Sequence, residues 1–260
     1  MGGWFESVAS LLTRSTALLT MIPLGIMLYR KPAFPLELGL IPYYIGADVF
    51  LALCDRVGKS YFRNNVPVFH FSTLFDITFI IFTYIRIFPA DKKKPIMAVW
   101  IVFLAIWLVS GLTIDHFTKD LNTISRIFGN GFVVILSISY IMQIFSFKSG
   151  SNDREATLLF SLFAFLYYSC STTAILFQDL PRYEIFKGIF MPSKSFQIFA
   201  ASPYPIVRLV QITLMVKMLI VLPTHITPRK ALPKWLRFRL GWRPPTEPPQ
   251  YRVLPAHLVG

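Results

Sequence analysis

The sequence predicts an all-α membrane protein, a polytopic bundle of about seven transmembrane helices. Composition is the first reason, because 54% of the 260 residues are hydrophobic, 15% are charged and the mean hydropathy is +0.56. Soluble domains usually carry about 25% charged residues. The second reason is that apolar runs of roughly twenty residues, the length that crosses about 30 Å of hydrocarbon, recur along the chain. The third is that the connections between these runs are short and polar.

Seven segments have the length and composition of a transmembrane helix. In chain order they are residues 8–28, 36–54, 67–88, 95–114, 124–147, 156–177 and 198–222. The connections between them read RKPAFP, DRVGKSYFRNN, PADKKKP, DHFTKD, KSGSNDRE and QDLPRYEIFKGIFMPSK. Pro67 and Pro95 suit the first position of a helix, where a backbone N–H has no acceptor within the helix.

The distribution of Lys and Arg predicts the orientation in the membrane. With seven spans, the first, third and fifth connections share a side with the C-terminal tail, and that side holds about twice as many Lys and Arg residues. Cytoplasmic loops are enriched in these residues, so we expect the N-terminus outside and the C-terminus in the cytoplasm. The net charge of +13 then follows from topology and anionic lipid, and no nucleic-acid partner is expected.

The chain is expected to divide into a bundle over residues 1–226 and a cytoplasmic tail over residues 227–260. The stretch KWLRFRLGWR mixes aromatic rings with guanidinium groups and should lie against membrane lipids. Its expected lipid contacts are Trp235, Arg237, Arg239, Trp242 and Arg243. The Pro-rich stretch PPTEPPQYRVLP has little capacity to fold alone, so we expect it to bind other membrane-protein subunits. Its expected contact residues are Pro244, Pro245, Pro248, Pro249 and Tyr251.

Polar and ionisable residues gather in the outer half of the predicted bundle. They are Arg14 in the first span, Asp48 in the second, His70, Thr73 and Asp76 in the third, and Arg208 and Gln211 in the seventh. An ionisable side chain inside a span costs several kcal/mol unless it pairs or meets water, so these residues should face the interior. Two interpretations stay open: a structural network of ion pairs, and a polar chamber that binds a ligand or ion.

The residues do not form a recognisable catalytic or metal site. A protein metal site needs three or four ligands, and His70 is the only histidine within a predicted span. We expect no cofactor. A haem or pigment on His70 lacks a second ligand, and a retinal on Lys217 is disfavoured because that lysine lies too near the inner end of its span. Asp48 and Asp76 do not lie in the motifs of intramembrane aspartyl proteases, so we favour a protein without enzymatic activity.

Two stretches resemble a family of uncharacterised seven-span bacterial inner-membrane proteins. NNVPVFHFSTLFDITFIIFTYIRIF is similar to the third span of that family, in which Asn-x-Pro-x-aromatic-His precedes an acidic residue, here Asp76 in place of glutamate. YPIVRLVQITLMVKMLIV is similar to its last span. Together the two stretches cover about a sixth of the chain. The resemblance implies the topology and the bacterial inner (cytoplasmic) membrane, and it implies no activity.

The sequence therefore predicts a non-enzymatic integral membrane subunit or scaffold of a larger inner-membrane protein complex. The Pro-rich tail, the lack of a soluble domain and the lack of a catalytic arrangement favour it. The alternative is a receptor or transporter that binds a small ligand or ion in the polar chamber. Transporters often show paired internal repeats, and none is visible in this sequence. Stabilisation of the isolated chain by a ligand would separate the two hypotheses.

Overall fold

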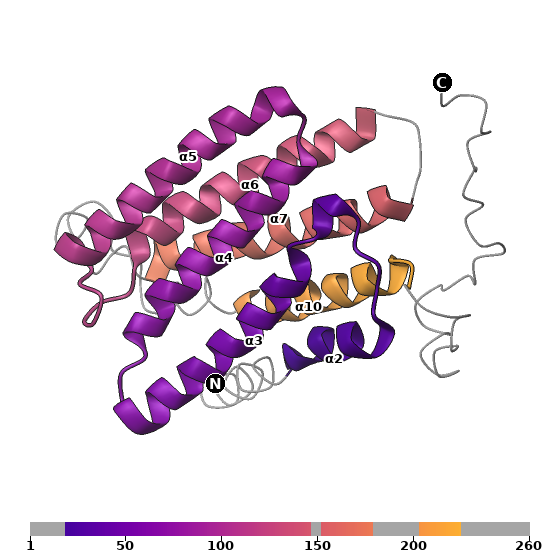
Figure 1. The fold of residues 1–260 in the computed structure, drawn as a ribbon. Helices are drawn as coiled ribbons and strands as arrows, with labels where there is room; N and C mark the ends of the chain where they lie inside the picture. The colour runs from indigo at the N-terminus through magenta and orange to yellow at the C-terminus, as the bar shows by residue number, and fades with distance from the viewer. Residues whose placement is uncertain (1–18, 147–151, 179–202, 225–260) are drawn as a thin grey trace, which may run out of the picture. The chain divides into compact units, whose positions relative to one another are not determined.

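The computed structural model describes residues 19–146, 152–178 and 203–224, which all belong to one unit of the chain, Met1–Ile226. These ranges are helical apart from their connections (Figure 1). The helices are α2 (Met21–Arg30), α3 (Ile41–Val57), α4 (Val66–Ile87), α5 (Ala90–Val109), α6 (Thr123–Ser146), α7 (Asn152–Gln178) and α10 (Pro203–Val221). A 3-10 turn precedes α3 at Leu36–Leu38, and π-helical turns extend α3 over Gly58–Phe62 and α5 over Ser110–Ile114. The all-α prediction is confirmed for the described part of the chain.

Five of the described helical segments are long and apolar enough to cross a membrane. They are Leu36–Phe62, Val66–Ile87, Ala90–Ile114, Thr123–Phe145 and Glu155–Phe177. They correspond to the second to sixth predicted spans, as expected of a multi-pass membrane protein. The structure describes the first predicted span only as the ten-residue α2 and the last only from Pro203 onward, so the count of seven stays a prediction. The predicted tail over residues 227–260 lies outside the described residues.

The start of α5 differs from the prediction. The helix begins at Ala90, so Pro95 lies inside it rather than at its first position. Pro89 precedes the helix with an extended backbone, and Asp91 lies in the first turn, where a carboxylate interacts favourably with the helix dipole. The first turn of α5 therefore contains the polar residues 91–94, and Pro95 follows it although proline has no backbone N–H to donate to that turn.

A tight reversal joins α3 to α4. Arg63 adopts a left-handed backbone, with φ 52°, and ends the helical segment. The Val66 N–H then donates to Asn64 Oδ1 at 3.0 Å, which satisfies one of the free donors at the start of α4. Gly58 allows this close approach, because a Cβ there would lie 3.2 Å from the Asn64 carbonyl oxygen. The facing sides of α3 and α4 are thereby brought together.

Helix α7 is the centre of the bundle. It packs along α6 and along α10, and Figure 1 shows it running between them. The most apolar stretch of α7 is 56% buried, whereas the corresponding stretches of the other four helical segments that could cross a membrane are 22% to 39% buried. Tyr84 of α4 packs on Phe160 with ring centroids 5.4 Å apart, and its hydroxyl donates to Ser137 Oγ of α6 at 2.9 Å. Tyr84 and Phe160 are among the largest fully buried side chains of the described residues.

Helix α2 is fastened to the end of α10. Arg30 Nη1 donates to the Leu219 carbonyl oxygen at 2.9 Å, and the Ala33 N–H donates to the Pro223 carbonyl oxygen at 2.6 Å. The last carbonyl groups of a helix have no partner within it, so these bonds satisfy acceptors that would otherwise stay unmet. The connection after α2 is therefore fixed to the far end of the described chain.

We expect Gly129→Ala to lower the free energy of unfolding by about 1–3 kcal/mol, because it overpacks the contact of α6 with α4 and α5. A Cβ at Gly129 would lie 2.9 Å from Phe103 Cε2 and 3.1 Å from Ile77 Cγ1. Gly131 is the matched control, because a Cβ there meets nothing within 4 Å. Gly131→Ala should be neutral or stabilising by up to about 1 kcal/mol. Unfolding in detergent measures both variants, and equal effects would contradict this packing.

Candidate functional site

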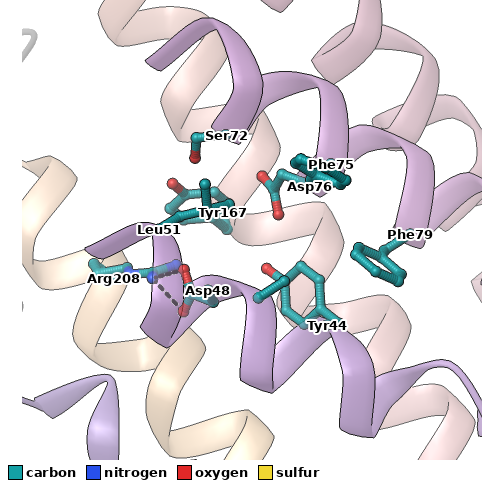
Figure 2. Close-up of a pocket in the computed structure, with 10 residues that line it drawn as sticks. Tyr44, Asp48, Leu51, Ser72, Phe75, Asp76, Phe79, Tyr167 and Arg208 are labelled. Carbon is teal, nitrogen blue, oxygen red and sulfur yellow. Dashed lines mark hydrogen bonds and ion pairs between the residues drawn. The ribbon is translucent and has the colours of Figure 1, made fainter. Parts of the chain in front are cut away.

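A polar cavity lies between facing sides of α3 and α4. On α3 its walls are Tyr44, Ala47, Asp48 and Leu51, and on α4 they are Ser72, Phe75, Asp76 and Phe79. Both sets are spaced by three, four and seven residues, so each lies on one side of its helix. Tyr167 of α7 and Arg208 of α10 complete the lining, as Figure 2 shows. The volume of this cavity is about 50 Å³.

A larger cavity of about 230 Å³ adjoins the first. The two share Asp48, Leu51, Ser72, Tyr167 and Arg208. The larger one is also lined by Asp55, near the end of α3, and by Val68 and Phe69, in the first turn of α4. It therefore extends from the middle of both helices toward the reversal at Arg63–Asn65.

An ion pair lines both cavities. Arg208 Nη2 donates to both carboxylate oxygens of Asp48 at 2.8 Å. Arg208 Nη1 donates to Gln211 Oε1 at 2.5 Å, and the guanidinium carbon lies 5.2 Å from the centre of the Tyr167 ring. Gln211 Nε2 in turn donates to the Tyr44 hydroxyl at 3.5 Å. Arg208 thus neutralises Asp48 and is held by contacts from three helices.

Asp76 has a different environment in the same cavity. Its side chain is half-buried, and it makes no ion pair with any residue of the described ranges. The hydroxyl groups of Tyr44 and Tyr168 lie beside it. Tyr168 is almost fully buried, and its hydroxyl faces the Asp76 carboxylate. The carboxyl group of Asp76 points into the cavity (Figure 2), so one carboxylate here is neutralised and the other is not.

His70 and Thr73 were predicted to join these residues, but the structure places them away from the cavity. Successive residues of an α-helix are about 100° apart, so His70 lies about 200° around α4 from Ser72. His70 Nε2 is 2.9 Å from the Asp120 carbonyl oxygen, and its ring packs edge-on against Phe117. Thr73 Oγ1 donates to the carbonyl oxygen of Phe69 on its own helix. His70 therefore holds the connection after α5 against the N-terminal part of α4.

The remaining predicted residues divide into two groups. Asp48, Asp76, Arg208 and Gln211 come together around the cavity. Arg14, the predicted lipid-contact residues and the predicted partner-binding prolines lie outside the described residues. Lys217, considered for a retinal, is exposed on α10 and does not line either cavity.

The prediction did not include several residues that line or border the cavity. Tyr44 and Ser72 lie four residues before Asp48 and Asp76, so helical spacing alone could have added them. Tyr167 and Tyr168 lie on α7, and Asp55 lies seven residues after Asp48. The two tyrosines could not be assigned from the sequence, because their approach to α3 and α4 depends on how the helices pack.

The arrangement suits binding rather than metal chemistry. Within the described ranges, no three His, Cys, Asp or Glu side chains are placed to hold a metal ion. Asp48 is committed to Arg208, so the two carboxylates do not form the contacting pair that an aspartyl dyad requires. The lining groups that can interact with a ligand are the Asp76 carboxylate, the hydroxyl groups of Tyr44 and Ser72, and the aromatic rings.

No protein-family model, curated protein or solved structure matches the chain.

We expect Arg208→Gln to lower the free energy of unfolding by about 2–3 kcal/mol, because it leaves the Asp48 carboxylate without its cation among apolar helices. Adding Asp48→Asn should recover part of that loss, because the uncompensated charge is removed. The control is Lys59→Gln, which breaks the exposed pair of Lys59 with Asp55, 2.7 Å apart, and should cost at most about 0.5 kcal/mol. Unfolding in detergent gives all three values, and similar losses in both single variants would refute the structural role of the Asp48–Arg208 pair.

Proposed function

We propose that this chain is a receptor or transporter that binds a small ligand in the two adjoining cavities bordered by α3, α4, α7 and α10. The observation that carries the proposal is the lining itself: an Asp–Arg ion pair, aromatic rings, and a carboxylate that makes no ion pair with any described residue. Binding sites for small molecules combine apolar or aromatic walls with a few oriented polar groups. Ionisable residues inside membrane spans commonly mark ligand or ion sites.

The size of the cavities favours ligand binding over a purely structural network. Both cavities are partly open, with volumes of about 50 and 230 Å³, and half-buried charged groups line them. A network that only held the helices together would need no such accessible space, whereas a small ligand needs both the space and the oriented polar groups.

We further propose seven spans, with the N-terminus outside and the C-terminus in the cytoplasm. Helices α2 and α10 would then be parts of the first and last spans. This topology puts the reversal at Arg63–Asn65 on the outer side, so the larger cavity would receive its ligand from outside. Placement in the bacterial inner membrane rests on the resemblance of two stretches and stays a prediction.

The subunit or scaffold hypothesis also stays a prediction. It depends on the Pro-rich tail, which lies outside the described residues, and no described contact favours it. A ligand-binding chain can also be part of a complex, so the two roles are compatible. The lining of the cavity supports the ligand-binding role directly.

The topology can be tested with reporters fused to the C-terminus. Positive-inside asymmetry predicts that a fluorescent protein fused there will fold and fluoresce, because it stays in the cytoplasm. Alkaline phosphatase at the same position should be inactive, because it is not exported. The reverse pattern would show an outside C-terminus, and the larger cavity would then open to the cytoplasm.

We expect Ala47→Leu to displace the ligand, because a larger side chain at this lining position fills the smaller cavity. Native mass spectrometry of the chain, extracted from its own membrane in mild detergent, should show a bound small molecule in the wild type. The bound fraction should fall at least about tenfold in Ala47→Leu. Ala105→Leu is the matched control, because Ala105 is exposed on α5 and lines neither cavity.

Two results would count against the proposal. One is a wild-type chain that carries no small molecule under extraction conditions gentle enough to retain lipids. The other is a bound molecule that stays equally occupied in Ala47→Leu and Ala105→Leu, since its site would then lie elsewhere.

A further inference from the structure

We infer that the ligand of this cavity is a small organic amine in its ammonium form, with the Asp76 carboxylate as its counter-ion. The inference rests on the proposed function, because it names the chemical class of ligand for the same cavity. It is carried by three features of the lining: the balance of charge, the aromatic walls and the absence of a free cation for an anionic ligand.

The balance of charge at the cavity leaves one negative group unmatched. Asp48 is neutralised by Arg208. Asp55, at the far end of the larger cavity, bonds to Lys59 Nζ at 2.7 Å and accepts from Asn65 Nδ2 at 2.5 Å. Asp76 lines the same cavity as Arg208 but makes no ion pair in the described part of the chain. A carboxylate half-buried among apolar helices is stabilised by an opposite charge, and a bound cation supplies it.

Aromatic rings surround the same carboxylate. Tyr44, Phe75, Phe79 and Tyr167 line the smaller cavity around Asp76, as Figure 2 shows. The face of an aromatic ring attracts a cation within about 6 Å. Tyr167 already carries Arg208, which leaves Tyr44, Phe75 and Phe79 for a ligand. The hydroxyl groups of Ser72 and Tyr44 can accept hydrogen bonds from an ammonium group, and the Tyr168 hydroxyl also lies beside Asp76.

Other classes of ligand fit the lining less well. A divalent metal ion requires six or more oxygen ligands for calcium, or near-octahedral coordination for magnesium, and the described residues offer no such cluster. An anion would meet the negative charge of Asp76. An amino acid needs a cation for its carboxylate, and both terminal nitrogens of Arg208 are already bonded, to Asp48 and to Gln211.

The dimensions indicate how such an amine would lie. The smaller cavity, of about 50 Å³, holds Asp76 and would take the ammonium group. The larger one, of about 230 Å³, leads toward the reversal between α3 and α4 and would take the rest of the molecule. Leu51, Ala52, Val68 and Phe69 line the larger cavity and suit a short apolar body.

The test uses the full chain in detergent, with n-butylammonium and 2-phenylethylammonium as probes. Butan-1-ol and butanoate are the neutral and anionic controls of matched size. Both ammonium ions should raise the unfolding temperature with increasing concentration up to about 50 mM, because a ligand that binds only the folded state stabilises it. The alcohol and the carboxylate should cause no shift beyond that of sodium chloride at equal ionic strength.

Variants then locate the site. Asp76→Asn should weaken the apparent affinity for the ammonium probes at least about tenfold, because it removes the counter-charge and keeps the shape. Asp76→Glu should retain measurable binding. Asp91→Asn is the control, because Asp91 is exposed in the first turn of α5 and does not line either cavity, and its affinity should equal that of the wild type. If Asp76→Asn does not fold, Phe79→Leu replaces it and should weaken the ammonium probes through loss of an aromatic wall.

Contrary results separate this inference from the proposed function. Equal stabilisation by butan-1-ol and butylammonium would overturn the amine inference, as would no stabilisation by either ammonium ion. If native mass spectrometry then shows a molecule of another class that Ala47→Leu displaces, the cavity still binds a ligand and only the amine assignment falls. If no molecule is displaced from the cavity either, both proposals fall.

Discussion

The cost of placing ionisable groups among apolar helices is the constraint on which the rest of this structure depends. Asp48 and Arg208 are 160 residues apart in the chain, yet Arg208 donates two bonds to the Asp48 carboxylate. The pair fixes α3 against α10, and the contact of Arg208 with Tyr167 adds α7. Because each charge satisfies the other, the three helices can meet around polar residues without leaving either charge isolated.

Residues of helix α4 face three different environments. The His70 side chain faces the connection after α5, where its Nε2 lies 2.9 Å from the Asp120 carbonyl oxygen. Trp107 Nε1 of α5 donates to the His70 carbonyl oxygen at 3.0 Å. Ser72 and Asp76 face the cavity. Ile77, Ile80 and Ile81 are buried in the apolar core. The polar residues of this helix therefore belong to separate sites. The buried isoleucines that follow them keep the helix in one orientation.

Helix α7 joins the polar and the apolar parts of the bundle. Phe160 and Phe163 pack edge-on, with ring centroids 5.1 Å apart, in the core near Tyr84. One to two turns further along, Tyr167 lines the cavity and Tyr168 lies beside Asp76. The rigid core thus continues into the wall of the cavity. A cavity wall supported by a packed core keeps its shape without a ligand, and this lowers the entropic cost of binding a ligand.

The sequence by itself determined the all-helical class and five of the spans, because the length of an apolar run and the charges at its ends depend only on neighbouring residues. It also singled out Asp48, Asp76 and Arg208, which the structure brings together around one cavity. The start of α5 at Ala90 was missed because residues 91–94 are charged and yet helical. Only the tertiary structure decided that Asp48 pairs with Arg208, that His70 turns toward Asp120 and that Tyr167 reaches the cavity. Those choices depend on how each helix is rotated about its axis, and that rotation is set by packing against helices distant in the chain.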